Sequence, residues 1–249
     1  MITILYDNAD GITWPTGMTL TSDDYLLVCD RGNNCILKMH KSGMGSVDVI
    51  YDSDDWVNEP TAITVDNSTG VIYWCNSGTD QVMKGKSDGT LVPIAMYGGD
   101  DVIRNADGIA IDKGRGKIYL SDNNLGILVG NLDGSGTPNV LFNKSNYPAM
   151  GCPRCLVSNP ETNTIYWIDM CGDEIISVYL SETSTPLVLY DRDDGVDGPQ
   201  AISIDYQAGK IYWSEASINV IASGNLNGSG TREVLVDNTD AKAFVLDFK

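Results

Sequence analysis

The chain has 249 residues, of which 42% are hydrophobic, and its formal net charge at pH 7 is −18. Such an acidic chain is a poor partner for nucleic acids and anionic membranes, because both attract basic protein surfaces. The sequence has no run of about 18 apolar residues, so direct membrane insertion is not expected, and we expect residues 1–249 to form a single domain.

A four-residue motif returns along the chain at an almost constant interval. Each copy ends in Asp, Asn or Glu, and the ends of successive copies lie 46 or 47 residues apart. The copies are Leu27–Asp30, Tyr73–Asn76, Tyr119–Asp122, Tyr166–Asp169 and Tyr212–Glu215. Self-similarity at this period indicates a repeat architecture, in which one supersecondary unit is stacked several times.

Five repeats follow one another, at roughly 14–59, 60–105, 106–152, 153–198 and 199–240. Within each repeat, short runs of β-branched and aromatic residues alternate with Gly, Asp, Asn and Ser, which predicts four strands joined by hairpins. In the second repeat we expect the strands over 60–66, 71–75, 81–86 and 91–97. Four strands in a repeat of this length are typical of a β-propeller blade.

Three submotifs recur in the same order: Pro-x-x-Ile-x-x-Asp, Gly-x-Ile-Tyr-Trp-x-Asp and Leu-Asp-Gly-Ser-Gly. Over nearly the whole chain this order resembles the YWTD repeat, also called the low-density lipoprotein receptor class B repeat. Departures from the pattern are Leu27 and Val28 for Tyr-Trp, Leu120 for Trp, Ser158 for Asp, and the terminal Glu215. The resemblance implies a six-bladed propeller that is usually extracellular and binds proteins or acts as a scaffold, rather than an enzyme.

The two ends of the chain match strands of a further blade. Residues 3–7 resemble the outer fourth strand of a repeat, and residues 242–247 resemble the inner first strand. We therefore expect an all-β, six-bladed propeller with five complete blades and an incomplete sixth, built from residues 1–7 and 241–249. Its open edges would be completed by a continuation of the polypeptide or by strand donation from another chain. The rival arrangement is a closed five-bladed ring.

Alternating strand directions place the starts of the first strands and the ends of the second strands on one face, here called the top face. All six cysteines fall on it. We predict a disulfide between Cys29 and Cys35 across a hairpin mouth, and another from Cys171 to either Cys152 or Cys155. Zinc bound by Cys152 and Cys155 is the rival interpretation, but a second Cys-x-x-Cys is missing and the chain has one histidine.

The expected disulfides would place the protein in an oxidising compartment. Three Asn-x-Ser/Thr sequons, at Asn67, Asn143 and Asn227, agree with secretion and are the candidate glycosylation sites. Asn227 also suits its turn without any sugar. We predict an extracellular or secreted protein.

The connections between blades also lie on the top face, and they hold 15 of the 34 acidic residues. One interpretation is solvated loops with aromatic plugs between blades; the other is a partner-binding surface, because loops on a rigid scaffold commonly carry recognition. The candidate partner-binding residues are Trp14, Asp54, Asp55, Trp56, Asp100, Asp101, Arg104, Asp193 and Asp194. An acidic top face would favour a protein partner with a basic segment, or calcium held by several carboxylates. No cofactor is assigned.

The leading functional hypothesis is therefore a non-enzymatic extracellular binding or assembly module. The alternative is a propeller enzyme of the metal-dependent lactonase or lyase type, with carboxylates at the mouth of the central channel. A hydrolytic triad is not expected, because the chain has a single histidine, His40, and no Ser/His/Asp arrangement. No catalytic residue is assigned.

Overall fold

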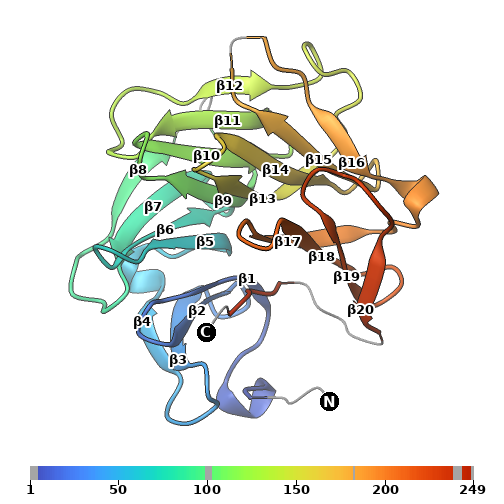
Figure 1. The fold of residues 1–249 in the computed structure, drawn as a ribbon. Helices are drawn as coiled ribbons and strands as arrows, with labels where there is room; N and C mark the ends of the chain where they lie inside the picture. Colours follow the sequence, from blue (N-terminus) through green and yellow to red (C-terminus); the bar gives the residue numbers. More distant parts are fainter. Residues whose placement is uncertain (1–4, 99–102, 182, 238–242, 248–249) are drawn as a thin grey trace.

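The computed structural model describes residues 5–98, 103–181, 183–237 and 243–247. These residues form five four-stranded antiparallel sheets around a common centre, numbered here as blades 1 to 5 in chain order (Figure 1). In each blade the strands are hydrogen-bonded in sequence order, from an inner first strand to an outer fourth strand. Neighbouring inner strands pack in the order β1, β5, β9, β13, β17.

The strand bounds repeat with the sequence motif. Blade 1 contains β1 (Pro15–Leu20), β2 (Tyr25–Asp30), β3 (Cys35–His40) and β4 (Asp48–Tyr51). Blade 2 contains β5 (Pro60–Asp66), β6 (Val71–Asn76), β7 (Gln81–Lys86) and β8 (Ile94–Gly98). Blade 3 contains β9 (Ala106–Asp112), β10 (Lys117–Asp122), β11 (Gly126–Asn131) and β12 (Asn139–Phe142). Blade 4 contains β13 (Pro153–Asn159), β14 (Thr164–Asp169), β15 (Glu174–Tyr179) and β16 (Leu187–Tyr190). Blade 5 contains β17 (Pro199–Asp205), β18 (Lys210–Glu215), β19 (Val220–Asn225) and β20 (Glu233–Val236).

The expectation of a six-bladed propeller is wrong, because the described residues form five blades. Of the segments expected to build a sixth, 5–7 and 243–247 carry no strand, and the remaining residues lie outside the described part of the chain. A strand needs a neighbour for its backbone groups, and the two segments bind blade 1 through side chains instead. The hydroxyl of Tyr6 donates to the carbonyl of His40 (2.8 Å), and Asp247 forms an ion pair with Lys41.

The last residue of each second strand is buried and fastens the loop that enters its blade. In blade 3, the Asp122 carboxylate accepts the backbone N–H groups of Arg104 and Asn105 from that loop, at 2.7 and 3.0 Å. It also accepts those of Asn124 and Leu125 from the next turn, at 2.8 and 2.9 Å. The equivalent buried residues are Asp30, Asn76, Asp169 and Glu215. Without these acceptors the loop N–H groups would be left unpaired inside the protein.

Aromatic side chains hold one blade against the next. The fully buried Trp74 stacks on Tyr51 of the preceding blade, with ring centroids 5.4 Å apart. The Tyr51 hydroxyl also donates to Leu91 O and accepts Lys86 N–H, both at 2.8 Å. A side chain at Gly85 would place its Cβ 2.9 Å from the Tyr51 ring, so glycine is required at this close approach. The corresponding stacked pairs in later blades are Phe142 with Trp167 and Tyr190 with Trp213.

Each loop that enters a blade also buries one apolar side chain, which packs between that blade and the preceding one in blades 2 to 5 and on blade 1 alone in the first loop. These buried residues are Ile12, Val57, Ile103, Met150 and Val196. Of the aromatic residues in these loops, Tyr147 is partly buried beside Met150, whereas Trp14 and Trp56 are exposed. The burial of the apolar side chains leaves the neighbouring residues of the same loops free to face solvent on the top face.

Replacing Asp122 with Ala is expected to lower the free energy of unfolding by roughly 3 kcal/mol, because four backbone N–H groups lose their acceptor. Urea unfolding followed by tryptophan fluorescence would measure the change. Asp23→Ala, at an exposed position, is the matched control and is expected to change stability by about 0.5 kcal/mol or less. Equal effects of the two substitutions would contradict the role given to the buried carboxylate.

Candidate partner-binding site

The five inner strands and residues 243–245 line a central cavity of about 630 Å³, which reaches Trp14 and Arg31 on the top face. The second residue of each inner strand lines it near the top, because these strands begin on that face. The five residues are Thr16, Thr61, Asp107, Arg154 and Gln200. The part of the cavity that they line is called the cavity mouth below. Aligning this position across the repeats would have found Arg154, which the sequence analysis considered only as part of a Cys-x-x-Cys segment.

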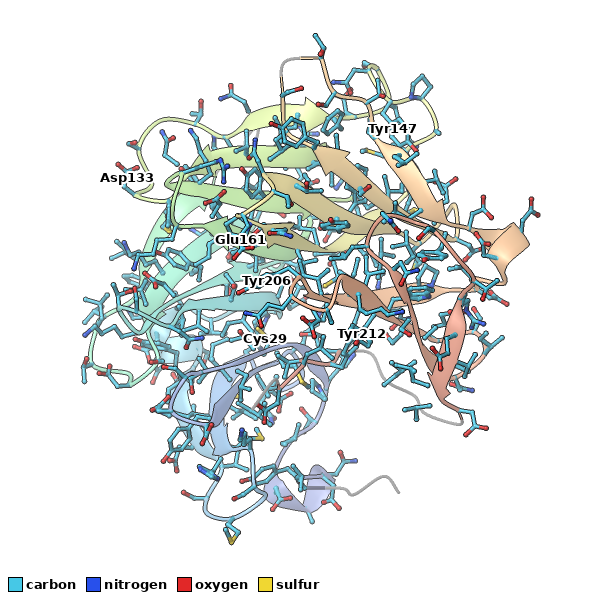
Figure 2. The ribbon with its side chains drawn as sticks, viewed as in Figure 1. Cys29, Asp133, Tyr147, Glu161, Tyr206 and Tyr212 are labelled. Carbon is cyan, nitrogen blue, oxygen red and sulfur yellow. A yellow bond between two sulfur atoms is a disulfide. The ribbon has the colours of Figure 1, made fainter. Side chains whose placement is uncertain are left out.

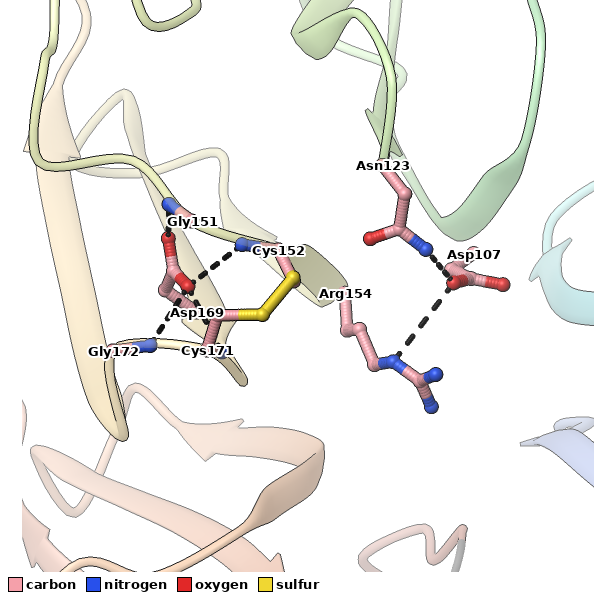
Figure 3. The surroundings of a disulfide bond; sticks show 8 residues. All are labelled: Asp107, Asn123, Gly151, Cys152, Arg154, Asp169, Cys171 and Gly172. Carbon is pink, nitrogen blue, oxygen red and sulfur yellow. Dashed lines mark hydrogen bonds and ion pairs between the residues drawn. A yellow bond between two sulfur atoms is a disulfide. The ribbon is translucent and has the colours of Figure 1, made fainter.

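Asp107 is the charged centre of the cavity mouth (Figure 3). One carboxylate oxygen, Oδ2, accepts the side-chain N–H of Asn123 and lies 3.9 Å from Nε of Arg154. Burial raises the pKa of Asp107, and the Arg154 guanidinium and the Asn123 amide only partly oppose this. Within the described part of the chain, Arg154 Nε and Asn123 Oδ1 are buried without a hydrogen-bond partner. Polar atoms left unsatisfied in this way are typical of a site that water or a ligand completes.

Arg31 joins the loops that enter blades 1 and 2. Its guanidinium carbon lies 5.0 Å from the centroid of the Trp14 ring, a cation–π contact, and its Nη2 forms an ion pair with Glu59. Trp14 is 51% exposed, so it is not a plug between blades. Arg31 is not among the predicted partner-binding residues, because its position in the turn after β2 gives no sign in the sequence of contact with two loops.

Trp56 stands on the top face in an unusual backbone conformation. It ends the short 3₁₀ turn η2 (Ser53–Asp55) with φ at 65°, and 64% of its surface is exposed. The two sister turns, η1 (Asn8–Asp10) and η3 (Arg192–Asp194), end at Gly11 and Gly195, with φ at 87° and 89°. Nδ2 of Asn76 donates to the carbonyl of Trp56 at 2.7 Å. An Asp at position 76, as the repeat motif usually has, would not supply this donor.

Many of the acidic residues in the top loops serve as caps. Asp52 and Asp191 cap η2 and η3 by accepting the N–H groups of Asp54 and Asp193, both at 2.8 Å.

The expected partner-binding residues fall in three sectors: Trp14, Asp54, Asp55 and Trp56 at blades 1 and 2, Arg104 before blade 3, and Asp193 and Asp194 before blade 5. Asp100 and Asp101 lie outside the described residues. The predicted set is thus not one continuous patch.

No described group of three or more His, Cys, Asp or Glu side chains is arranged to hold a metal ion. Of the described residues that line the central cavity, Asp107 alone carries a carboxylate. The described residues therefore do not bring together, at the cavity, the several carboxylates expected for a metal-dependent lactonase or lyase.

No protein-family model matches the chain. It is 30% identical to protein cueball of Drosophila willistoni over 36% of its length, and 32% identical to low-density lipoprotein receptor-related protein 8 of Gallus gallus over 29%. The matches span only 14% and 8% of those proteins. A nidogen/laminin complex contains a similar fold, with a TM-score of 0.76, 21% identity, and coverage of 88% of this chain and 79% of that chain. A gluconolactonase from Xanthomonas campestris also gives 0.76, with 16% identity and coverage of 98% and 82%.

The recurring motif, the stacked four-stranded blades and these likenesses agree. The chain is a β-propeller of the YWTD type. The likeness to low-density lipoprotein receptor-related proteins agrees with the expected extracellular or secreted location. Among the described residues, no helix has the length and apolar character that a membrane span requires.

This YWTD-type propeller contains a disulfide between Cys152 and Cys171 (Figure 3), and Cys155 is a free thiol. The expected Cys29–Cys35 bridge is wrong, because both residues are free and buried. Cys35 pairs with Asp30 across the hairpin, so Cys35 and Cys29 lie one register position apart and point to opposite faces of the sheet. Cys29 accordingly packs against blade 2 (Figure 2), whereas Cys35 packs beside Ile12 on the other face.

Asp107→Asn is expected to stabilise the propeller at pH 7. The pKa of Asp107 is raised in the folded state, so ionisation of this group costs stability as the pH rises from its ordinary value of 3.8 through the folded value. The gain in thermal unfolding temperature is therefore expected at pH 7 and should vanish near pH 3, where Asp107 itself is protonated.

Asp133→Asn is the matched control of opposite sign, because the Ser135 hydroxyl and N–H lower the pKa of Asp133. It should give no gain at pH 7. A gain for Asp107→Asn that persists unchanged at pH 3 would contradict the assignment, since ionisation would then not be its cause.

Proposed function

We propose that this propeller is a non-enzymatic, extracellular protein-binding module whose partner docks on the top face of blades 1 and 2. The docking surface consists of Trp14, Arg31, Trp56 and Glu59, with Asp54 and Asp55 beside it, and is called the tryptophan rim. The observation that carries the proposal is Trp56, a large exposed aromatic residue at a position where both sister turns have glycine.

Holding a non-glycine residue in the left-handed region costs roughly 1–2 kcal/mol. Trp56 does not offset this cost by burial, because most of its surface faces solvent. A strained residue whose side chain is mostly exposed is a candidate for function. Tryptophan is also among the residues most enriched at the energetic centres of protein interfaces.

The charges of the tryptophan rim indicate the chemistry of the partner. Arg31 is already neutralised by Glu59 and lies over Trp14, whereas Asp54 and Asp55 adjoin Trp56. This arrangement fits a partner segment with an apolar anchor next to basic residues. The net charge of −18 would speed the approach of such a partner at low salt. The solved nidogen/laminin complex supports the proposal as a protein of this fold that assembles with another protein.

The fold likeness to a gluconolactonase keeps an enzymatic alternative in view. The chemistry of the cavity mouth gives it less support, because among the described residues Asp107 is the one carboxylate there and is paired with Arg154. The only histidine, His40, ends β3, a strand that does not line the cavity. We therefore rank binding above catalysis.

Trp56→Gly separates binding from folding, because it gives the loop the residue that the sister turns use. Its unfolding temperature should equal or exceed that of the wild type. Binding to a partner recovered from extracellular-matrix extract and then purified should weaken about 30-fold, since loss of an interface centre costs ~2 kcal/mol. Biolayer interferometry would measure it.

Tyr179→Ala is the matched control, because Tyr179 is 59% exposed at the end of β15, away from the top face. It should leave the affinity unchanged. A Trp56→Gly variant that is well folded and binds as tightly as the wild type would refute the tryptophan rim.

A further inference from the structure

Asn143 occupies a capping position that its sister loops fill with aspartate. Its Oδ1 accepts the N–H of Ser145 at 2.9 Å. Asp7, Asp52 and Asp191 make the same bond to the residue two positions ahead, at 2.7, 2.8 and 2.8 Å. The cap therefore needs one side-chain oxygen and makes no use of the amide nitrogen that Asn143 adds.

The amide nitrogen of Asn143 is available for modification. Among the hydrogen bonds of the described residues none uses Nδ2 of Asn143, and Lys144 and Ser145, which complete the sequon, are exposed. Asn67 differs, because its Oδ1 accepts Ser22 N–H and its Nδ2 donates to Leu20 O at 3.3 Å, which ties blade 2 to blade 1. A sugar on Asn67 would compete with that contact.

Nδ2 of Asn227 also takes part in none of the described hydrogen bonds, but this asparagine has a structural role in its turn. Its Oδ1 accepts the N–H and the hydroxyl of Ser229, at 3.0 and 2.6 Å. Asp133 makes the same two bonds to Ser135 in blade 3. Asn227 thus repeats a turn that aspartate builds equally well, and none of the described cavities is lined by it.

A second cavity, of about 430 Å³, lies beside Asn143 on the top face between blades 3 and 4. Its wall combines polar side chains, from Asn124 and Ser145, with apolar ones, from Leu125, Val140 and Met150. A pyranose ring has the matching character, with hydroxyl groups at its rim and apolar C–H faces. The cavity is large enough for a small ligand of this kind.

We propose that Asn143 carries an N-linked glycan and that its first sugar lies in this cavity. In the reaction, Nδ2 forms a bond to the anomeric carbon of a lipid-linked oligosaccharide, the lipid diphosphate leaves, and the amide nitrogen loses one proton. Oδ1 is untouched, so the cap on Ser145 survives glycosylation. The inference is independent of the tryptophan rim, which lies on the loops of blades 1 and 2.

Secretion of the full chain from eukaryotic cells, followed by glycopeptide mass spectrometry, tests the modification. The expected result is a glycan on Asn143 that is lost in Asn143→Asp, a variant that keeps the capping oxygen as Asp52 and Asp191 do. Its unfolding temperature should match that of the enzymatically deglycosylated wild type. Asn67→Asp and Asn227→Asp are controls that should leave the glycan on Asn143 in place.

Hydrogen–deuterium exchange tests the position of the sugar. After trimming to a single N-acetylglucosamine, the segments 123–126 and 150–153 should exchange more slowly in the wild type than in Asn143→Asp. An unmodified Asn143 in the secreted protein would overturn the proposal. A modified Asn143 with unchanged exchange in both segments would overturn the placement of the sugar in the cavity.

Discussion

The structure depends on a buried carboxylate or amide at the end of each second strand. This side chain accepts backbone N–H groups of the loop that enters its blade, and so it fixes that loop to the end of the second strand. Charge-assisted bonds of this kind are stronger than neutral ones, and their loss leaves several buried donors unpaired. Because each of the five blades has such a residue at the same position, the same kind of interaction holds all five loops on the top face.

The same interaction also positions the candidate binding residues. The carboxylate of Asp30 accepts the N–H of Trp14 at 2.9 Å, and the amide of Asn76 holds the carbonyl of Trp56 at 2.7 Å. Burial alone would raise the pKa of Asp30, but the N–H groups of Trp14 and Thr13 hold it below its usual value. Both tryptophans therefore project from loops whose backbones are fixed, and such preorganisation reduces the entropy lost on binding.

The pKa shifts of Asp66, on the bottom face, and Asp107, at the cavity mouth, have opposite directions. On the bottom, the Ser68 and Thr69 hydroxyls and the Lys113 ammonium outweigh burial and keep the pKa of Asp66 low. At the cavity mouth, burial raises the pKa of Asp107, and among the described residues Nε of its ion-pair partner Arg154 is buried without a hydrogen bond. The cavity mouth also differs from the rest of the described top face, where the carboxylates of Asp30 and Asp122 accept several backbone N–H groups. Such a local exception is typical of a functional site.

The 46-residue period by itself determined the strands, their grouping into blades and the face on which the connecting loops lie. The strands expected in the second repeat, 60–66 and 81–86, agree with β5 and β7, because runs of β-branched and apolar residues bounded by turn residues are a clear pattern in sequence. The fourth strand, expected over 91–97, begins three residues later as β8. Tertiary structure alone decided the rest. The number of blades depends on whether terminal segments find backbone partners, and the state of Cys29 and Cys35 depends on which side of the sheet each thiol faces. The exposure of Trp56 and the contact of Arg31 with two loops follow from packing between blades, which a single repeat does not encode.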